Sequence, residues 1–175
     1  MNKNTGAYAG VFIMIEVMAQ SSFSKTLSRY DGAFVRFCKR EYVHLLRIAL
    51  FLVYFWFGFL KAIDLSPAHP LVQSLFERTI HFMPYDMFYV LFAIFEMVIG
   101  ILFLMPKLER VALTLLALHL VTTVLPLFLL PETTWQGLFI PTLEGQYIIK
   151  NVLIIAAAIA LAATLSPARK TKTQS

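Results

Sequence analysis

The chain has 175 residues, of which 59% are hydrophobic and 14% are charged. An ordinary soluble domain carries about 45–50% apolar and about 25% charged residues, so this composition excludes that class and favours a chain in contact with lipid. The net charge of +5 comes from basic residues beside apolar runs, which favours anionic lipid as a partner and argues against nucleic acid.

The first 42 residues are predicted to form a cytoplasmic or interfacial segment. Their apolar stretch, residues 9–18, contains Glu16 and is too short to cross about 30 Å of hydrocarbon, so we expect residues 1–30 to lie at the interface or to fray. Residues 31–47 repeat apolar side chains at spacings of three and four opposite basic ones, which predicts an amphipathic interfacial helix. Cys38 lies on that helix, and as the single cysteine it excludes an intramolecular disulfide.

Four apolar stretches then follow, each close to the 20 residues that a helix needs to cross a bilayer. The predicted fold class is all-α, an integral membrane four-helix bundle over residues 43–165, with spans at 43–63, 86–105, 110–130 and 146–165. Pro126 is expected to kink the third span. Between the first two spans, Pro70 and the apolar positions after it predict a short amphipathic helix over 70–81. In the second outer loop, Trp135 suits the aromatic belt.

Basic residues are distributed unequally between the two sides of the predicted bundle. Most of the 15 lie before or in the first turns of the first span, in the turn between the second and third spans, or in the tail, residues 166–175. Lysine and arginine collect on the cytoplasmic side of membrane proteins. Both termini are therefore expected to be cytoplasmic, which agrees with an even number of spans.

Ionisable side chains in or beside the spans are costly in hydrocarbon, so each is a candidate functional residue. The helical rise places Glu96 and His119 about 15 and 16 Å below the outer ends of their spans, which predicts a hydrogen bond able to move a proton. Lys61 and Lys150 lie about 3 and 6 Å below those ends. With Glu144 at the mouth they are expected to form an ion-pair cluster, while Lys61 and Glu96 are expected to stand about 12 Å apart.

Each candidate also has a structural interpretation. Lys61 can extend its ammonium group to the headgroups, Glu96 can be a protonated carboxyl bonded to a neighbouring helix, and His119 has Thr122 and Thr123 nearby. Gly58 and Gly100 are expected at close helix contacts. The four histidines lack metal-binding spacing, and no catalytic residue, metal site or cofactor is predicted beyond a quinone as a bound ligand.

Three segments together resemble the DoxX-like family of four-helix bacterial inner-membrane proteins. They are Arg47 with the stretch 55–61, the stretch 95–100, and the stretch 145–151, and the resemblance covers about residues 45–165. It implies a multi-pass protein of the bacterial inner membrane. The family takes its name from a small subunit of a thiosulfate:quinone oxidoreductase, so the resemblance also implies a link to quinone or sulfur redox chemistry. The positions it singles out are Gly58, Lys61, Glu96, Gly100 and Lys150.

Three functional hypotheses follow. The leading one is an accessory membrane subunit of an oxidoreductase, without a redox centre of its own, in which the buried charges hold a quinone head or a small anion. The second is a small proton-coupled transporter, since buried Glu and His are typical of proton relays. The third is a structural or assembly partner of other membrane proteins. A homo-oligomer is compatible with all three.

Overall fold

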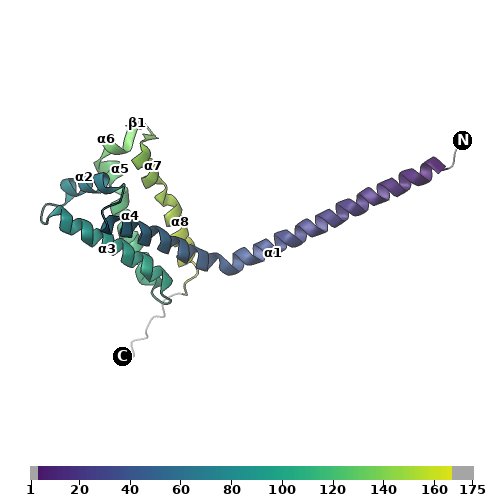
Figure 1. Ribbon diagram of the computed structural model, residues 1–175, viewed down its shortest axis with the longest axis horizontal. Helices are drawn as coiled ribbons and strands as arrows, with labels where there is room; N and C mark the ends of the chain where they lie inside the picture. The colour runs from purple at the N-terminus through teal and green to yellow at the C-terminus, as the bar shows by residue number, and fades with distance from the viewer. Residues whose placement is uncertain (1–3, 167–175) are drawn as a thin grey trace, which may run out of the picture. The chain divides into compact units, whose positions relative to one another are not determined.

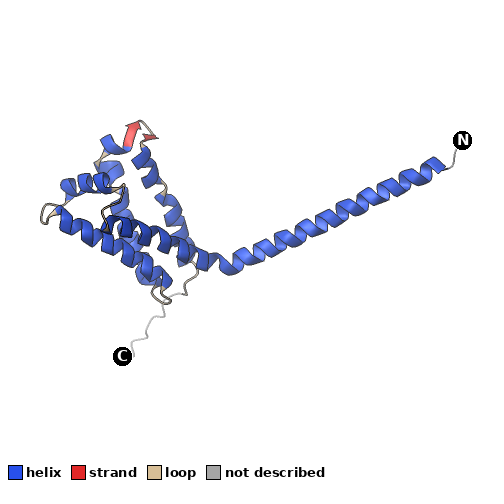
Figure 2. Cartoon of the chain, in the orientation of Figure 1, coloured by secondary structure: helices blue, strands red, loops and turns tan. Residues whose placement is uncertain are grey.

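The computed structural model describes residues 4–166, with side chains from residue 28 onward, and it is mostly helical (Figures 1 and 2). The basic tail after residue 166, like the side chains of residues 1–27, lies outside the described part. The elements in chain order are α1 (Asn4–Ala62), α2 (His69–Thr79), α3 (Tyr85–Leu104), α4 (Glu109–Val124), α5 (Pro126–Leu129), α6 (Pro131–Thr134), β1 (Trp135–Gly137), β2 (Ile140–Pro141), α7 (Leu143–Ile149) and α8 (Asn151–Ala162).

Four segments are long and apolar enough to cross a membrane: Ser28–Ala62, Tyr85–Leu104, Glu109–Leu129 and Leu143–Ala162. They correspond to the four predicted spans, with three differences. The backbone of α1 is helical from Asn4, so the expected fraying does not occur there. The third segment is interrupted at Leu125, before Pro126. The fourth is interrupted at Lys150, where the amide of Leu153 donates to the carbonyl of Lys150 in a tight turn.

The chain divides into two compact units, Met1–Tyr42 and Val43–Ser175. In the first, large apolar side chains at Tyr30, Phe34 and Phe37 are exposed. Exposed apolar side chains on a helix that also carries Arg36 and Lys39 fit the expected amphipathic pattern. The core and the candidate site described below belong to the second unit.

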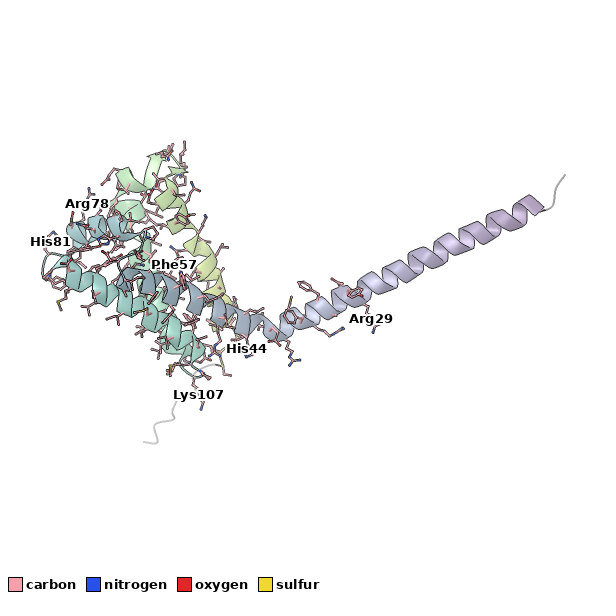
Figure 3. All side chains as sticks on the ribbon, viewed as in Figure 1. Arg29, His44, Phe57, Arg78, His81 and Lys107 are labelled. Atoms are coloured by element: carbon pink, nitrogen blue, oxygen red, sulfur yellow. The ribbon has the colours of Figure 1, made fainter. Side chains whose placement is uncertain are left out.

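The core of the second unit lies where α1, α3, α4 and α8 meet. Its largest fully buried side chains include Phe103, Ile99, Leu116 and Leu161. At one end of the unit, which we call the α2 end, α2, α5, α6 and the strands gather (Figure 1). Figure 3 shows Arg78 and His81 at this end and Lys107 at the opposite one, which we call the Lys107 end. All elements that carry the candidate residues are therefore part of one packed unit.

The predicted outer helix forms as α2, close to its expected bounds, and packs onto the bundle. Pro70 occupies its first turn, where a missing amide donor costs nothing. Phe76 is buried between the rings of Tyr85 and Phe88 at the start of α3. On the opposite side of α2, Arg78 pairs with Glu132 of α6 at 2.9 Å. This helix thus covers the α2 end of the unit.

A small β hairpin follows α6 and was not predicted from the sequence. Trp135 pairs with Pro141 and Gly137 with Ile140 in antiparallel register. The indole of Trp135 donates to the carbonyl of Leu127 at 3.0 Å, which fixes the hairpin to α5. Five residues are too few to show the alternating pattern by which a strand is recognised in a sequence.

Arg47 joins three helices at the Lys107 end. Its Nε donates to the carbonyl of Phe103 at 2.7 Å, and its Nη1 lies 3.2 Å from the carboxylate of Glu109. The carbonyls in the last turn of a helix lack partners within the helix, so the first bond completes the end of α3. The guanidinium is thereby fixed where α1, α3 and α4 converge.

We expect Arg47→Met to lower the free energy of unfolding by about 1.5–3 kcal/mol, the usual contribution of a hydrogen bond to a charged group. Thermal unfolding in detergent, followed by circular dichroism, measures the change. Arg40→Met is the matched control, because the side chain of Arg40 is 86% exposed. Equal losses in the two variants would contradict a special role for Arg47.

Candidate functional site

Lys61, Glu96 and His119 form one hydrogen-bonded network between α1, α3 and α4. The ammonium Nζ of Lys61 lies 2.7 Å from Oε2 of Glu96, and Nε2 of His119 lies 3.0 Å from Oε1. Each of the three residues is at most 6% exposed. One carboxylate therefore contacts a lysine and a histidine away from solvent. We call these three residues the buried network.

The end of α1 is built so that Lys61 lies in its last turn. Asp64 adopts a left-handed conformation with φ of 56°. The amide of Leu65 donates to the carbonyl of Leu60, and the amide of Asp64 donates to that of Lys61. This pair of bonds is the Schellman motif, in which glycine usually takes the left-handed position. It stops the helix at Ala62, one residue after Lys61.

The segment after α1 closes the network from the α2 end. The carboxylate of Asp64 lies 2.8 Å from Nδ1 of His69, and the ring of His69 packs 4.6 Å from that of Tyr89. Tyr89 is seven residues before Glu96 on α3, hence on the same face and about 10 Å nearer the α2 end. Its hydroxyl is buried, with the side chain of Ser66 beside it. Asp64, His69 and Tyr89 thus form a group of titratable side chains on the α2-end side of the network.

Aromatic rings form the walls around the network. The ring of Phe92 stacks on His119 at 5.3 Å and lies 5.6 Å below the Lys61 ammonium. Tyr54 of α1 meets the imidazole edge-on at 5.2 Å. Aromatic faces attract cations, and their bulk excludes water. The Lys61 ammonium and the His119 imidazole are therefore held in a largely apolar surrounding.

Close helix packing brings the side chain of Lys61 within reach of Glu96. A Cβ on Gly58 would come within 2.8 Å of the carbonyl oxygen of Ala93, so α1 and α3 touch backbone to backbone there. Gly58 is four residues from the end of α1, but Ala93 is eight from the start of α3. Helix α1 therefore ends about 6 Å short of α3. Lys61 lies three residues beyond Gly58 toward the α2 end, and Glu96 lies three residues beyond Ala93 toward the Lys107 end, so their backbones are about 9 Å apart along the helices. The flexible four-carbon stem of lysine covers much of this distance.

The expected cluster of Lys61, Lys150 and Glu144 is wrong. The prediction aligned the ends of the four spans, whereas α1 ends below α3, so Lys61 pairs with Glu96 instead. Lys150 and Glu144 are exposed on or beside α7. The ammonium of Lys150 lies over the ring of Tyr147, three residues earlier, at 4.8 Å. Of the five candidate residues, the structure brings together Lys61, Glu96 and His119 and leaves the other two outside.

The partners of His119 fit two proton states. Oγ1 of Thr123 lies 3.1 Å from Nδ1 and 2.9 Å from the carbonyl oxygen of His119. With a neutral imidazole, Nε2–H donates to Glu96 and the threonine hydroxyl donates to Nδ1. With a charged imidazolium, Nδ1–H donates to Thr123, whose hydroxyl turns to the carbonyl. Rotation of one hydroxyl thus satisfies both states, so the network can take up and release a proton with little rearrangement.

Other candidate chemistry is not visible in the described residues. Between residues 28 and 166, no group of three or more His, Cys, Asp or Glu side chains is placed to hold a metal ion. Cys38 is a half-buried free thiol. Two features that the sequence analysis missed are the buried hydroxyl of Tyr89 and the Lys61–Glu96 contact. The spacing Gly58-x-x-Lys61 beside Glu96-x-x-x-Gly100 is the signal for the second, since small residues mark where helices approach closely.

Comparison with known proteins gives no match: no family model, no curated protein sequence and no solved structure is significantly similar to this chain. The fold and the site define the class only as a mostly helical chain with four helices able to cross a membrane and a buried Lys–Glu–His network.

Proposed function

We propose that this chain is a proton-handling membrane subunit that works with a quinone-linked redox partner. The carrying observation is that Glu96 contacts both Lys61 and His119, and that His119 has suitable partners in two proton states. A proton site is favoured over the expected pocket for a quinone head, because the network is enclosed by packed side chains. The redox link rests on the resemblance to DoxX-like proteins, and the partner supplies the electron chemistry.

The proposed setting is a bacterial inner membrane with both termini in the cytoplasm. This orientation follows from the basic residues at the Lys107 end, in the first helix and in the tail. The α2 end then faces outward. Proton exchange would run between this face and the network, along Tyr89, His69 and Asp64.

The test is a titration of the purified protein in lipid nanodiscs. Infrared difference spectra recorded at a series of pH values are expected to show carboxyl and imidazole bands that change together. When the chain is reconstituted together with the oxidoreductase that co-purifies with it, a ubiquinone analogue is expected to shift that titration. Glu96→Gln should abolish the carboxyl band and the shift. Lys150→Met should change neither, because Lys150 lies outside the network.

Two outcomes of this titration would contradict different parts of the proposal. Spectra without any titrating band from Glu96 or His119 would overturn the proton site. A titrating band that the quinone analogue leaves unchanged would overturn the redox link while retaining the proton site.

A second candidate is a small proton-coupled transporter. The observation that favours it is the group of Asp64, His69 and Tyr89 on the α2-end side of the network, since proton relays use such side chains. Proteoliposomes would then show a pH-driven solute flux that Glu96→Gln removes. If the network is purely structural, as in an assembly partner, Glu96→Gln should change the stability of the protein and neither the titration nor the flux.

A further inference from the structure

Helices α4 and α8 border a groove separate from the buried network. Its middle part, of about 240 Å³, is lined by apolar side chains alone: Leu113, Leu116, Ala117, Leu120, Ile155, Ala158, Ile159 and Ala162. A second cleft, of about 320 Å³, adjoins it toward the Lys107 end and shares Leu113 and Ala162 with it. The two form one continuous groove with an apolar length and a polar end.

Small side chains leave the groove open. Ala117, Ala158 and Ala162 stand where larger apolar residues would fill the space between the helices. The groove runs along two segments that are apolar enough to cross a membrane. Its walls therefore face hydrocarbon in the proposed setting, and a flexible hydrocarbon chain is the natural material to fill it.

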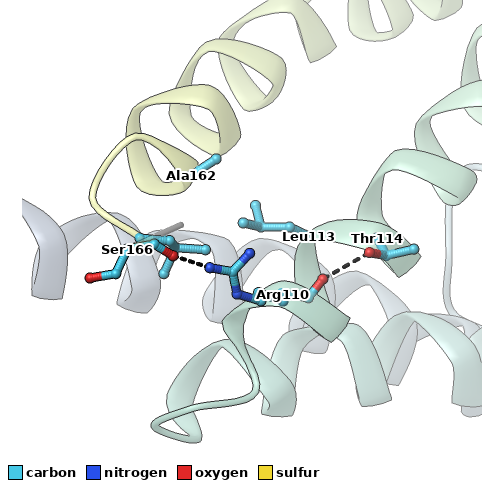
Figure 4. A pocket seen from close by; sticks show the side chains of 6 residues that line it. Arg110, Leu113, Thr114, Ala162 and Ser166 are labelled. Carbon is cyan, nitrogen blue, oxygen red and sulfur yellow. Dashed lines mark hydrogen bonds between the residues drawn. The ribbon is translucent and has the colours of Figure 1, made fainter. Parts of the chain in front are cut away.

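Arg110 marks the polar end of the groove (Figure 4). Its Nη2 donates to the backbone carbonyl of Ser166, which holds the guanidinium across the cleft. A guanidinium has five N–H donors, so donors are left for a further acceptor. The neighbouring carboxylate of Glu109 is engaged by Arg47 at 3.2 Å and is not among the lining residues. The lining of this end thus carries one positive charge and no acidic group.

The length of the groove matches one leaflet of a bilayer. Ten residues separate Arg110 from Leu120, or about 15 Å along α4. The hydrocarbon core of a bilayer is about 30 Å thick, so this is about half of it. A lipid in the leaflet on the Lys107 side would place its headgroup at Arg110 and one acyl chain beside Leu116 and Ile159.

We propose that this groove binds one acyl chain of an anionic glycerophospholipid whose phosphate contacts Arg110. The inference requires that the four segments cross a bilayer, but it does not depend on the proton chemistry of the network. An anionic lipid is favoured over a quinone because a quinone head is uncharged, whereas a guanidinium binds a phosphate through paired, charge-assisted hydrogen bonds.

Native mass spectrometry of the detergent-purified full chain tests the headgroup. Phosphatidylglycerol is expected to bind about fivefold more tightly than phosphatidylcholine with the same acyl chains, since one basic side chain near the surface contributes about 1 kcal/mol. Arg110→Gln should remove this preference. Lys107→Gln, an exposed lysine in the adjacent turn, should retain it. Equal binding of the two lipids, or a preference that survives Arg110→Gln, would overturn the proposal.

A second pair of variants tests the groove itself. Ala117→Leu fills the groove from an exposed position and should weaken binding of both lipids. Ala156→Leu, at an exposed position of α8 outside the groove, should not. Equal effects in these variants would overturn the acyl-chain site. Displacement of phosphatidylglycerol by a ubiquinone analogue, or a dimer that Ala117→Leu alone dissociates, would identify a quinone or a second copy as the occupant and likewise overturn it.

Discussion

Glu96→Gln is expected to lower the free energy of unfolding by about 3–5 kcal/mol, because it leaves the Lys61 ammonium buried without its carboxylate. The expected effect is large because the pair is enclosed on all sides by packed helices and aromatic rings. Water cannot replace the lost partner without opening the contact between α1 and α3. Unfolding in mixed micelles with increasing SDS, followed by circular dichroism, measures the change.

The double variant Glu96→Gln/Lys61→Met separates pairing from simple loss of packing. Removing both charges leaves no buried ion, so the double variant should be more stable than Glu96→Gln alone, with a coupling of about 1–3 kcal/mol. Lys150→Met, which removes an exposed lysine, should stay within about 0.5 kcal/mol of the parent. Additive losses in the double variant would show that Lys61 and Glu96 do not interact in the folded protein.

The level of Glu96 and His119 could be predicted from the sequence because both lie near the middle of their helices. An error of a few residues at the helix ends barely changes their relative height, and their contact is present at 3.0 Å. The helical class and the four long apolar segments follow from composition and run length in the same way. These properties depend on each helix alone.

The contact of Lys61 with Glu96 could not be predicted from the sequence of either helix alone. The level of Lys61 depends on how far α1 slides along α3, and this offset is set by the contact of Gly58 with Ala93. Apolar run length reports where a helix can lie in a bilayer, but not its offset from a neighbour. Glu144 and Lys150 were misplaced for a related reason, because the prediction treated all four spans as equal and upright. The two-strand hairpin was not predicted because its pairing involves too few residues to give a sequence pattern.

Gly58→Val is expected to have the second large effect, about 1–3 kcal/mol of lost stability. A Cβ there would lie 2.8 Å from the carbonyl oxygen of Ala93 and 2.9 Å from the amide nitrogen of Met97. Both are backbone atoms, so no side-chain rotation can relieve the clash and α1 must move away from α3. Because Gly58 lies three residues before Lys61, the movement should also lengthen the Lys61–Glu96 contact.

The effect of Gly58→Val on the Lys61–Glu96 contact can be measured separately from its effect on packing. In the Gly58→Val background, Glu96→Gln should cost less than in the parent, since part of the ion pair is already lost. Gly137→Val is the matched control, because a Cβ at Gly137 meets only the side chain of Ile140 at an ordinary 3.7 Å. It should leave both the stability and the cost of Glu96→Gln nearly unchanged. If Glu96→Gln costs the same in all three backgrounds, then close approach at Gly58 does not position Lys61, and the offset between α1 and α3 must be set elsewhere along their contact.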